Sequence, residues 1–155
     1  MSAARTPRLT RITSREDAMT YAGDLTPHEA WKLLEDEPDA ILVDVRTEAE
    51  WRFTGVPDAS GLGKQPALIE WVTYPTMQRN EGFLDQLKAT GAEPGRPIVF
   101  LCRSGARSIG AAEAATAAGL GPAYNVLEGF EGATDEHGHR GWQGWKGAGL
   151  PWQQG

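Results

Sequence analysis

The chain has 155 residues, of which 40% are hydrophobic and 23% charged, and its formal net charge is −6. This acidic balance argues against nucleic acid or an anionic membrane surface as the main partner. No stretch approaches the ~18 consecutive apolar residues of a membrane span. A single cysteine, Cys102, and a start without the apolar core of a secretory signal favour a reducing compartment, most simply the cytoplasm.

The first residues differ in composition from the rest of the chain. Residues 1–20 show little apolar periodicity and carry four arginines before any acid appears: Arg5, Arg8, Arg11 and Arg15. This composition predicts a disordered or loosely attached tail. Residues 21–155 have the length of one folded domain, and we expect a single one.

Two helix starts are readable in the first half of this domain. Thr26, Pro27 and Glu29 combine an N-cap hydroxyl, a proline at the first helical position and a glutamate that closes a capping box. The helix that follows should end near residues 37–38. Thr47-Glu48-Ala49-Glu50 repeats the pattern and predicts a second, short helix. Between them, the apolar run 40–45 is typical of a strand covered on both faces.

The middle of the chain is less regular. The prolines and glycines of residues 55–75 indicate a loop, within which residues 68–72 form either a short strand or an anchored apolar segment. Residues 83–90 have the pattern of a helix with Gly91 as its C-cap.

The second half repeats the order of strand and helix. Residues 97–101 are a buried-looking strand, residues 102–108 a polar turn, residues 109–118 an alanine-rich helix, and residues 124–127 a last strand. Alternating strands and helices predict an α/β domain built on a mostly parallel sheet.

The segment after Glu128 is rich in glycine and tryptophan, with indoles at Trp142, Trp145 and Trp152. Buried tryptophans usually serve stability, so we expect this segment to pack over the domain, with an aromatic ligand platform as the alternative. His137 and His139 lie in the same glycine-rich stretch without a cysteine, and solvated side chains are favoured there over a metal site.

The most informative residue is Cys102, at the predicted turn from strand to helix. Backbone N–H groups and the positive end of a helix dipole converge at such a turn and favour a thiolate. No acidic residue lies between Glu93 and Glu113, whereas Arg96, Arg103 and Arg107 do. We therefore expect a basic island around the thiol and an anionic small substrate. An inert buried cysteine with solvated arginines is the structural alternative.

Three motifs carry a resemblance to a known family. The loop Cys102-Arg-Ser-Gly-Ala-Arg107-Ser108 resembles the active-site loop of single-domain rhodanese-like sulfurtransferases. Asp44-Val45-Arg46 is similar to that family's D-x-R signature, and Asn125 to Phe130 to its strand before a glycine turn. The matches extend over residues 23–152 in the family's order.

The resemblance implies a rhodanese-like α/β fold, a five-stranded mostly parallel sheet flanked by helices on both faces. It implies that Cys102 takes a sulfane sulfur from a small anionic donor such as thiosulfate, carries it as a persulfide, and gives it to a thiol, a protein or cyanide. It implies no metal and no cofactor. Asp44 and Arg46 are implied to be structural supports. The residues implied to cradle the persulfide are Arg103, Ser104, Gly105, Ala106, Arg107 and Ser108.

Alternatives remain within the same fold. Related phosphatases and arsenate reductases place five residues between cysteine and arginine, whereas only four separate Cys102 from Arg107, which favours a ring sized for one sulfur atom. A binding or persulfide-sensing module without useful turnover is the other alternative. Two segments depart from the family pattern: Thr54 to Ala59 lacks the usual histidine and second glycine, and Ser60 to Asn80 is long. We expect this long segment to shape substrate choice if it overhangs the loop.

Overall fold

The computed structural model describes residues 21–73, 76–103, 106–132 and 144–154. The basic tail predicted for residues 1–20 lies outside them. The helices are α1 (Pro27–Asp36), α2 (Glu48–Thr54), α3 (Phe83–Ala89), α4 (Arg107–Ala117) and α5 (Gly144–Gly147), with a 3₁₀ turn at Ser60–Leu62. The strands are β1 (Gly23–Leu25), β2 (Ile41–Asp44), β3 (Val56–Pro57), β4 (Ala67–Leu68), β5 (Val72–Thr73), β6 (Gln78–Arg79), β7 (Pro94–Leu101), β8 (Gly121–Val126) and β9 (Trp152–Gln153).

A five-stranded sheet in the order β1-β8-β7-β2-β4 forms the centre of the domain. Every neighbouring pair in it is parallel, so the predicted α/β sheet is confirmed. The strands β2 and β7 lie inside the sheet and are buried on both faces, which explains their unbroken apolar runs. The three-residue strand β1 was not predicted, because it pairs with β8 from almost the other end of the chain.

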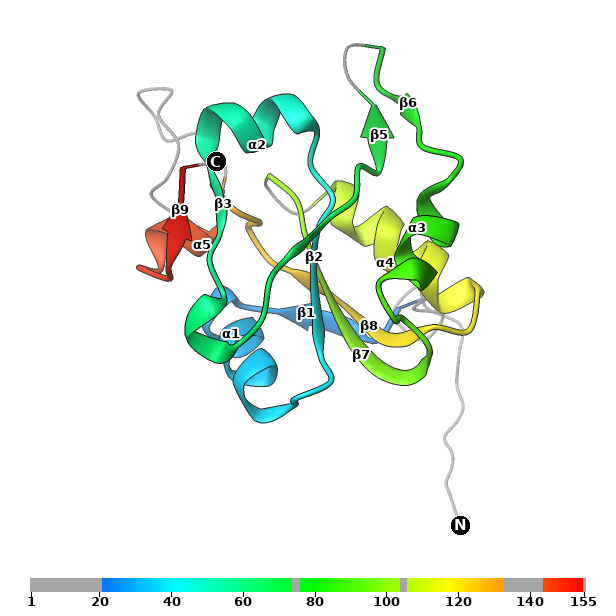
Figure 1. The fold of residues 1–155 in the computed structure, drawn as a ribbon, viewed down its shortest axis with the longest axis horizontal. Coiled ribbons are helices and arrows are strands. Elements are labelled where there is room, and N and C mark those ends of the chain that lie inside the picture. The colour runs from blue at the N-terminus through cyan, green and yellow to red at the C-terminus, as the bar shows by residue number, and fades with distance from the viewer. Residues whose placement is uncertain (1–20, 74–75, 104–105, 133–143, 155) are drawn as a thin grey trace, which may run out of the picture.

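Helices cover both faces of this sheet, as Figure 1 shows. On one face, α3 and α4 pack against side chains such as Phe100 and Ile98. On the other face, α1 and the segment of α5 pack against Leu42 and Val99. Neighbouring residues of one strand therefore serve two separate cores, because successive side chains point to opposite faces.

The capping boxes of α1 and α2 are both present as predicted, closed by Thr26 with Glu29 and by Thr47 with Glu50. The helix predicted at residues 83–90 is α3, which is followed by Gly91 at φ 102°. Within the segment of uncertain structure, β4 joins the sheet edge beside β2, whereas the side chains of Ile69 and Trp71 are buried. Residues 68–72 are thus partly strand and partly an anchored apolar segment.

The described part of the C-terminal segment packs on the domain as expected. Trp145 is fully buried and donates from its indole nitrogen to the carbonyl of Pro151 at 2.6 Å. The strand β9 then pairs antiparallel with β3, and Gln154 donates to the carbonyl of Arg52 in α2, so the last described residues lie beside α2 (Figure 1). Trp142 lies outside the described residues. Among the described helices, no candidate for a membrane span is found.

Candidate functional site

Cys102 lies directly after β7, at the carboxyl end of an inner parallel strand, and α4 begins a few residues later. The predicted order of strand, turn and helix is confirmed. The side chain is 1% exposed and belongs to the core between the sheet and α4. Its backbone carbonyl accepts a hydrogen bond of 2.7 Å from the amide of Phe130. Ser104 and Gly105, predicted to cradle the sulfur, lie outside the described residues.

The Ser108 side chain contacts the sulfur of Cys102. Its hydroxyl oxygen lies 3.2 Å from Cys102 Sγ and is also hydrogen bonded to Asn125 Oδ1. Ser108 does not cap α4, because the N-cap of that helix is Ala106 and no side chain there accepts a hydrogen bond from the helix. Ser108 is fully buried in the first turn of α4 and faces the thiol.

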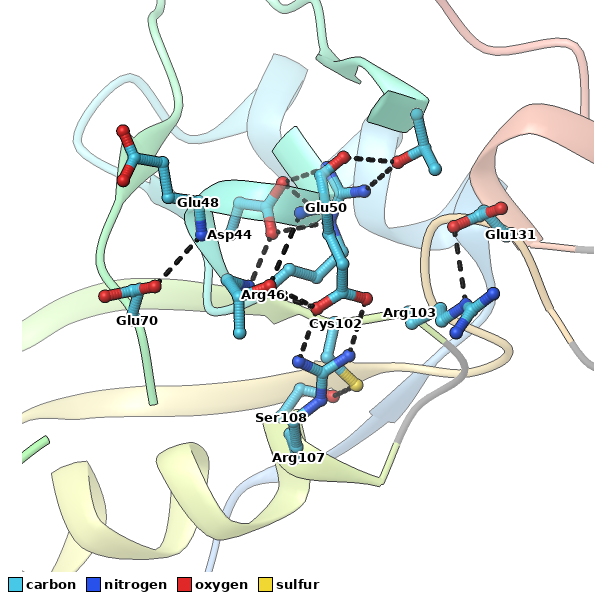
Figure 2. Close-up of polar contacts among 12 residues, drawn as sticks. Asp44, Arg46, Glu48, Glu50, Glu70, Cys102, Arg103, Arg107, Ser108 and Glu131 are labelled. Carbon is cyan, nitrogen blue, oxygen red and sulfur yellow. Dashed lines mark hydrogen bonds and ion pairs between the residues drawn. The ribbon is translucent and has the colours of Figure 1, made fainter. Parts of the chain in front are cut away.

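Arg107 is held by a carboxylate from another helix. Its two terminal nitrogens donate to Glu50 of α2 at 2.7 and 2.9 Å (Figure 2). Burial raises the pKa of Glu50, but hydrogen bonds from Arg107 and Thr47 outweigh burial and lower that pKa from 4.5 to about 2. Burial opposes the charge of Arg107, yet Glu50 and, more weakly, the charge of Cys102 raise the pKa of the guanidinium.

Arg103 faces a second carboxylate, on the segment after β8. Its Nε lies 3.6 Å from Glu131 Oε2, a distance of ion pairing rather than of hydrogen bonding (Figure 2). Both atoms are buried and have no hydrogen-bond partner among the described residues. The Arg103 side chain as a whole is 42% exposed, twice the 21% of Arg107. Arg103 is therefore the more accessible cation of the two.

The predicted basic island does not exist in three dimensions. Arg96 lies at the start of β7 and donates to the carbonyls of Asp39 and Gly91. Six extended residues place it roughly 20 Å from Cys102. The other two arginines are accompanied by Glu50 and Glu131. The prediction rested on a stretch of sequence without acidic residues. It did not account for the carboxylates that other segments bring to the same edge of the sheet.

Asp44 and Arg46, expected to be structural supports, form a buried ion pair. Arg46 Nη2 lies 2.6 Å from Asp44 Oδ2, and both side chains are fully buried. Arg46 also donates to the carbonyl of Gly55 and stacks 4.2 Å over the ring of Phe130. Because the amide of Phe130 holds the carbonyl of Cys102, the pair braces the cysteine turn from β2.

A pocket of about 410 Å³ lies beside the cysteine turn, and its lining includes Arg103 and Arg107 but not Cys102 itself. The ion pairs of Arg107 with Glu50 and of Arg103 with Glu131 line this pocket. Two exposed apolar side chains also line it: Phe53, which is 82% exposed, and Met77, which is 48% exposed. Met77 belongs to the long segment Ser60 to Asn80, which was expected to shape substrate choice if it overhangs the loop, and it lines this pocket. The full lining is Thr47, Ala49, Glu50, Phe53, Thr54, Met77, Arg103, Arg107 and Glu131.

Three residues of the site were not identified from the sequence: Glu50, Asn125 and Glu131. Glu50 was recognised as a capping residue, and it does accept from the Thr47 amide while also binding Arg107. The sequence pattern around Asn125 indicates only a strand that leads into a glycine turn. Nothing in the linear pattern of Glu131 indicates its neighbour Arg103.

The described residues contain no cluster of three histidine, cysteine or acidic side chains suited to a metal ion. The stretch with His137 and His139 lies outside the described residues. The geometry provides a buried thiol whose sulfur contacts the Ser108 hydroxyl. The neighbouring pocket is lined by two arginine–glutamate ion pairs and has apolar side chains at its rim.

Comparison with known proteins finds a family profile and relatives that match most of the chain. The family profile described as "STR4 middle domain" matches residues 22–155. The crystal structure of Rv0390 from M. tuberculosis is 58% identical in sequence and superposes with a TM-score of 0.81, over 87% of this chain and 99% of that one. The uncharacterized protein RP600 of Rickettsia prowazekii is 36% identical over 126 residues, 81% of this chain and 92% of its own length.

More distant relatives have named activities. Thiosulfate sulfurtransferase GlpE of Actinobacillus pleuropneumoniae is 26% identical over 128 residues, 83% of this chain and 90% of that protein. The polysulfide-sulfur transferase of Wolinella succinogenes, solved as a homodimer, is 25% identical with a TM-score of 0.61, over 89% of this chain and 82% of that one.

Proposed function

Since the chain belongs to the single-domain rhodanese-like family, we propose that it is a sulfurtransferase of the thiosulfate type, acting in the cytoplasm through a persulfide on Cys102. The observation that carries the proposal is the placement of its one cysteine at the carboxyl end of β7, with the Ser108 hydroxyl 3.2 Å from the sulfur. A nucleophile at this edge of a parallel sheet faces the region where α/β proteins bind their ligands.

The proposed first half-reaction transfers one sulfur atom to the enzyme. The Cys102 thiolate attacks the outer, sulfane sulfur of thiosulfate, a new S–S bond forms, and the old S–S bond breaks with its electron pair leaving on sulfite. Arg103, the more exposed of the two site cations, meets the anionic donor first. The product is a Cys102 persulfide whose terminal sulfur carries the negative charge.

The proposed second half-reaction regenerates the thiolate. An acceptor thiolate or cyanide attacks the terminal sulfur of the persulfide, and the bonding electron pair returns to Cys102 Sγ. Because the chain contains one cysteine, no second thiol of the same chain can take the sulfur. The acceptor must therefore arrive from outside, as a small thiol or as the thiol of another protein.

The two half-reactions are separable by mass. After incubation with thiosulfate and removal of the excess, the intact protein should carry one additional sulfur atom, and cyanide should remove it. The Cys102→Ser variant is the matched control and should carry none. No adduct on the native protein, or an equal adduct on Cys102→Ser, would contradict the proposal.

A second candidate function is a domain that docks a partner or senses persulfide without useful turnover. Phe53 and Met77 favour it, because two exposed apolar side chains at the rim of a site suit a protein surface. Steady-state turnover with thiosulfate and cyanide no faster than that of free cysteine, despite formation of the adduct, would support this function over the first.

A further inference from the structure

A chain of side-chain hydrogen bonds connects the sulfur of Cys102 with the outer edge of the sheet. Ser108 Oγ contacts Cys102 Sγ at 3.2 Å and bonds Asn125 Oδ1, while Asn125 Nδ2 donates to Asp24 Oδ1 at 2.9 Å. Asp24 and Asn125 are register partners in the parallel pair β1 and β8. Cys102, Ser108 and Asn125 are buried, whereas Asp24 is exposed.

The carboxylate at the outer end determines the direction of the bonds. An ionised carboxylate only accepts hydrogen bonds, so Asn125 turns its amide nitrogen to Asp24 and its oxygen to Ser108. A serine hydroxyl has a single proton. Ser108 can therefore donate to Asn125 or to the sulfur of Cys102, but not fully to both.

The two protonation states of Cys102 use this proton differently. With a neutral thiol, every donor can have an acceptor: the S–H can donate to Ser108 Oγ, Ser108 donates to Asn125, and Asn125 donates to Asp24. With a thiolate, the Ser108 proton turns to the sulfur, and the buried oxygen of Asn125 loses the side-chain donor that the described residues give it. Losing the donor of a buried acceptor is costly. The arrangement thus favours the thiol.

We propose that Asn125, oriented by Asp24, is a positioning residue that directs the Ser108 hydroxyl away from Cys102 and so restrains formation of the nucleophilic thiolate. The proposal deepens the proposed function, on which it rests for the role of Cys102. In each half-reaction the sulfur becomes a thiolate at one stage, and the turn of the Ser108 proton from Asn125 to the sulfur accompanies that stage.

Other charged groups face the same thiol. Arg107 of α4 is one of them: the pKa of its guanidinium is raised by Glu50 and, more weakly, by the charge of Cys102. Glu50 of α2 and Asp44 of β2 counterbalance that guanidinium. None of these groups belongs to the hydrogen-bond chain through Ser108, so variants at Asn125 test the chain separately from the ion pairs.

The test measures the ultraviolet absorbance of the thiolate against pH, with Cys102→Ser as the blank. Because Cys102 is the one cysteine, the signal has a single source. Asn125→Leu removes the competing acceptor at similar volume, and it should move the midpoint of thiolate formation down by about one pH unit, a tenfold change in the ionisation equilibrium. In the Ser108→Ala background the same substitution should have no effect, because there is no hydroxyl proton to redirect.

Asp24→Asn provides a second route through an exposed residue, in case Asn125→Leu does not fold as judged by thermal melting. Asp24→Asn allows the Asn125 side-chain amide to exchange the positions of its oxygen and nitrogen. The midpoint of thiolate formation should then move down by less than in Asn125→Leu, and only in proteins that retain Ser108. An unchanged midpoint, or an equal shift with and without Ser108, would overturn the proposal in favour of packing or charge alone. Since the measurement uses no sulfur donor, its failure leaves the sulfurtransferase proposal standing, and a missing thiosulfate adduct leaves this one standing.

Discussion

Glu50 and Arg107, 57 positions apart in the chain, form a two-pronged ion pair at the site, with N–O distances of 2.7 and 2.9 Å. The pair joins α2 to the first turn of α4, the helix that begins just after Cys102. It has two consequences: it fastens the cysteine turn to the domain, and it neutralises a cation that the sequence presents as free.

The first consequence predicts a pH-dependent contribution to stability. The pKa of Glu50 is about 2 in the folded protein against 4.5 for an ordinary glutamate, so the folded state binds fewer protons than the unfolded state between these values. The stabilisation is therefore complete above pH 4.5 and is lost as the pH falls towards 2. Glu50→Gln should lower the free energy of unfolding by about 2–3 kcal/mol at neutral pH.

Urea unfolding at several pH values checks this prediction. The difference between the native protein and Glu50→Gln should shrink steadily below pH 4.5. Glu48→Gln is the matched control on the same helix, because Glu48 pairs with Arg52 on the exposed surface and should contribute less than about 1 kcal/mol. A difference that does not vary with pH would contradict the assignment.

The second consequence, the neutralisation of Arg107 by Glu50, concerns binding of the anionic sulfur donor. Arg107→Ala should lower kcat/KM for thiosulfate by about 10- to 150-fold, the loss expected for about 1.5–3 kcal/mol of charge-assisted bonding. Glu50→Gln should act in the opposite direction, because it frees the Arg107 guanidinium for an anion. Steady-state kinetics on both variants and on the double variant measure this. An unchanged kcat/KM in Arg107→Ala would remove Arg107 from the donor site.

The buried pair of Asp44 and Arg46 predicts a large loss of stability. Arg46→Leu leaves the fully buried Asp44 carboxylate without its cation, and breaking such a pair typically costs about 3–5 kcal/mol. Arg52→Leu, which breaks an exposed pair, should cost less than about 1 kcal/mol. Chemical denaturation measures the free energy of unfolding of both variants. Equal losses of stability would show that the buried pair contributes no more to stability than the exposed pair.

Because Gly129 has no side chain, the backbone after β8 can approach the turn at Cys102 closely. A Cβ there would lie 2.4 Å from the Cys102 carbonyl oxygen, and φ is +59°. Gly129→Ala should therefore lower both stability and the rate of persulfide formation, since either the turn at Cys102 or the segment after β8 must move. Gly119→Ala isolates the cost of positive φ, because Gly119 has φ +80° and open space around it. Melting curves and adduct rates for the two variants should differ; identical results would exclude the steric explanation.

The sequence alone determined the main helices, the inner strands of the sheet and the place of Cys102 at a turn from strand to helix. The caps at Thr26 and Thr47, the apolar strands predicted at residues 40–45 and 97–101 and the turn at Cys102 depend on interactions within a few residues, which local sequence patterns record. The D-x-R pair was also readable, because Asp44 and Arg46 are two positions apart.

Only the tertiary structure decided what surrounds the thiol. Glu50 and Glu131 reach the site from other segments, Arg96 leaves it along an extended strand, and Asn125 meets Asp24 across a parallel register 101 positions apart. Ion pairs and sheet register depend on how distant segments pack, and no local period or spacing encodes them. The sequence therefore predicted a free basic site around Cys102, whereas the fold builds a balanced one.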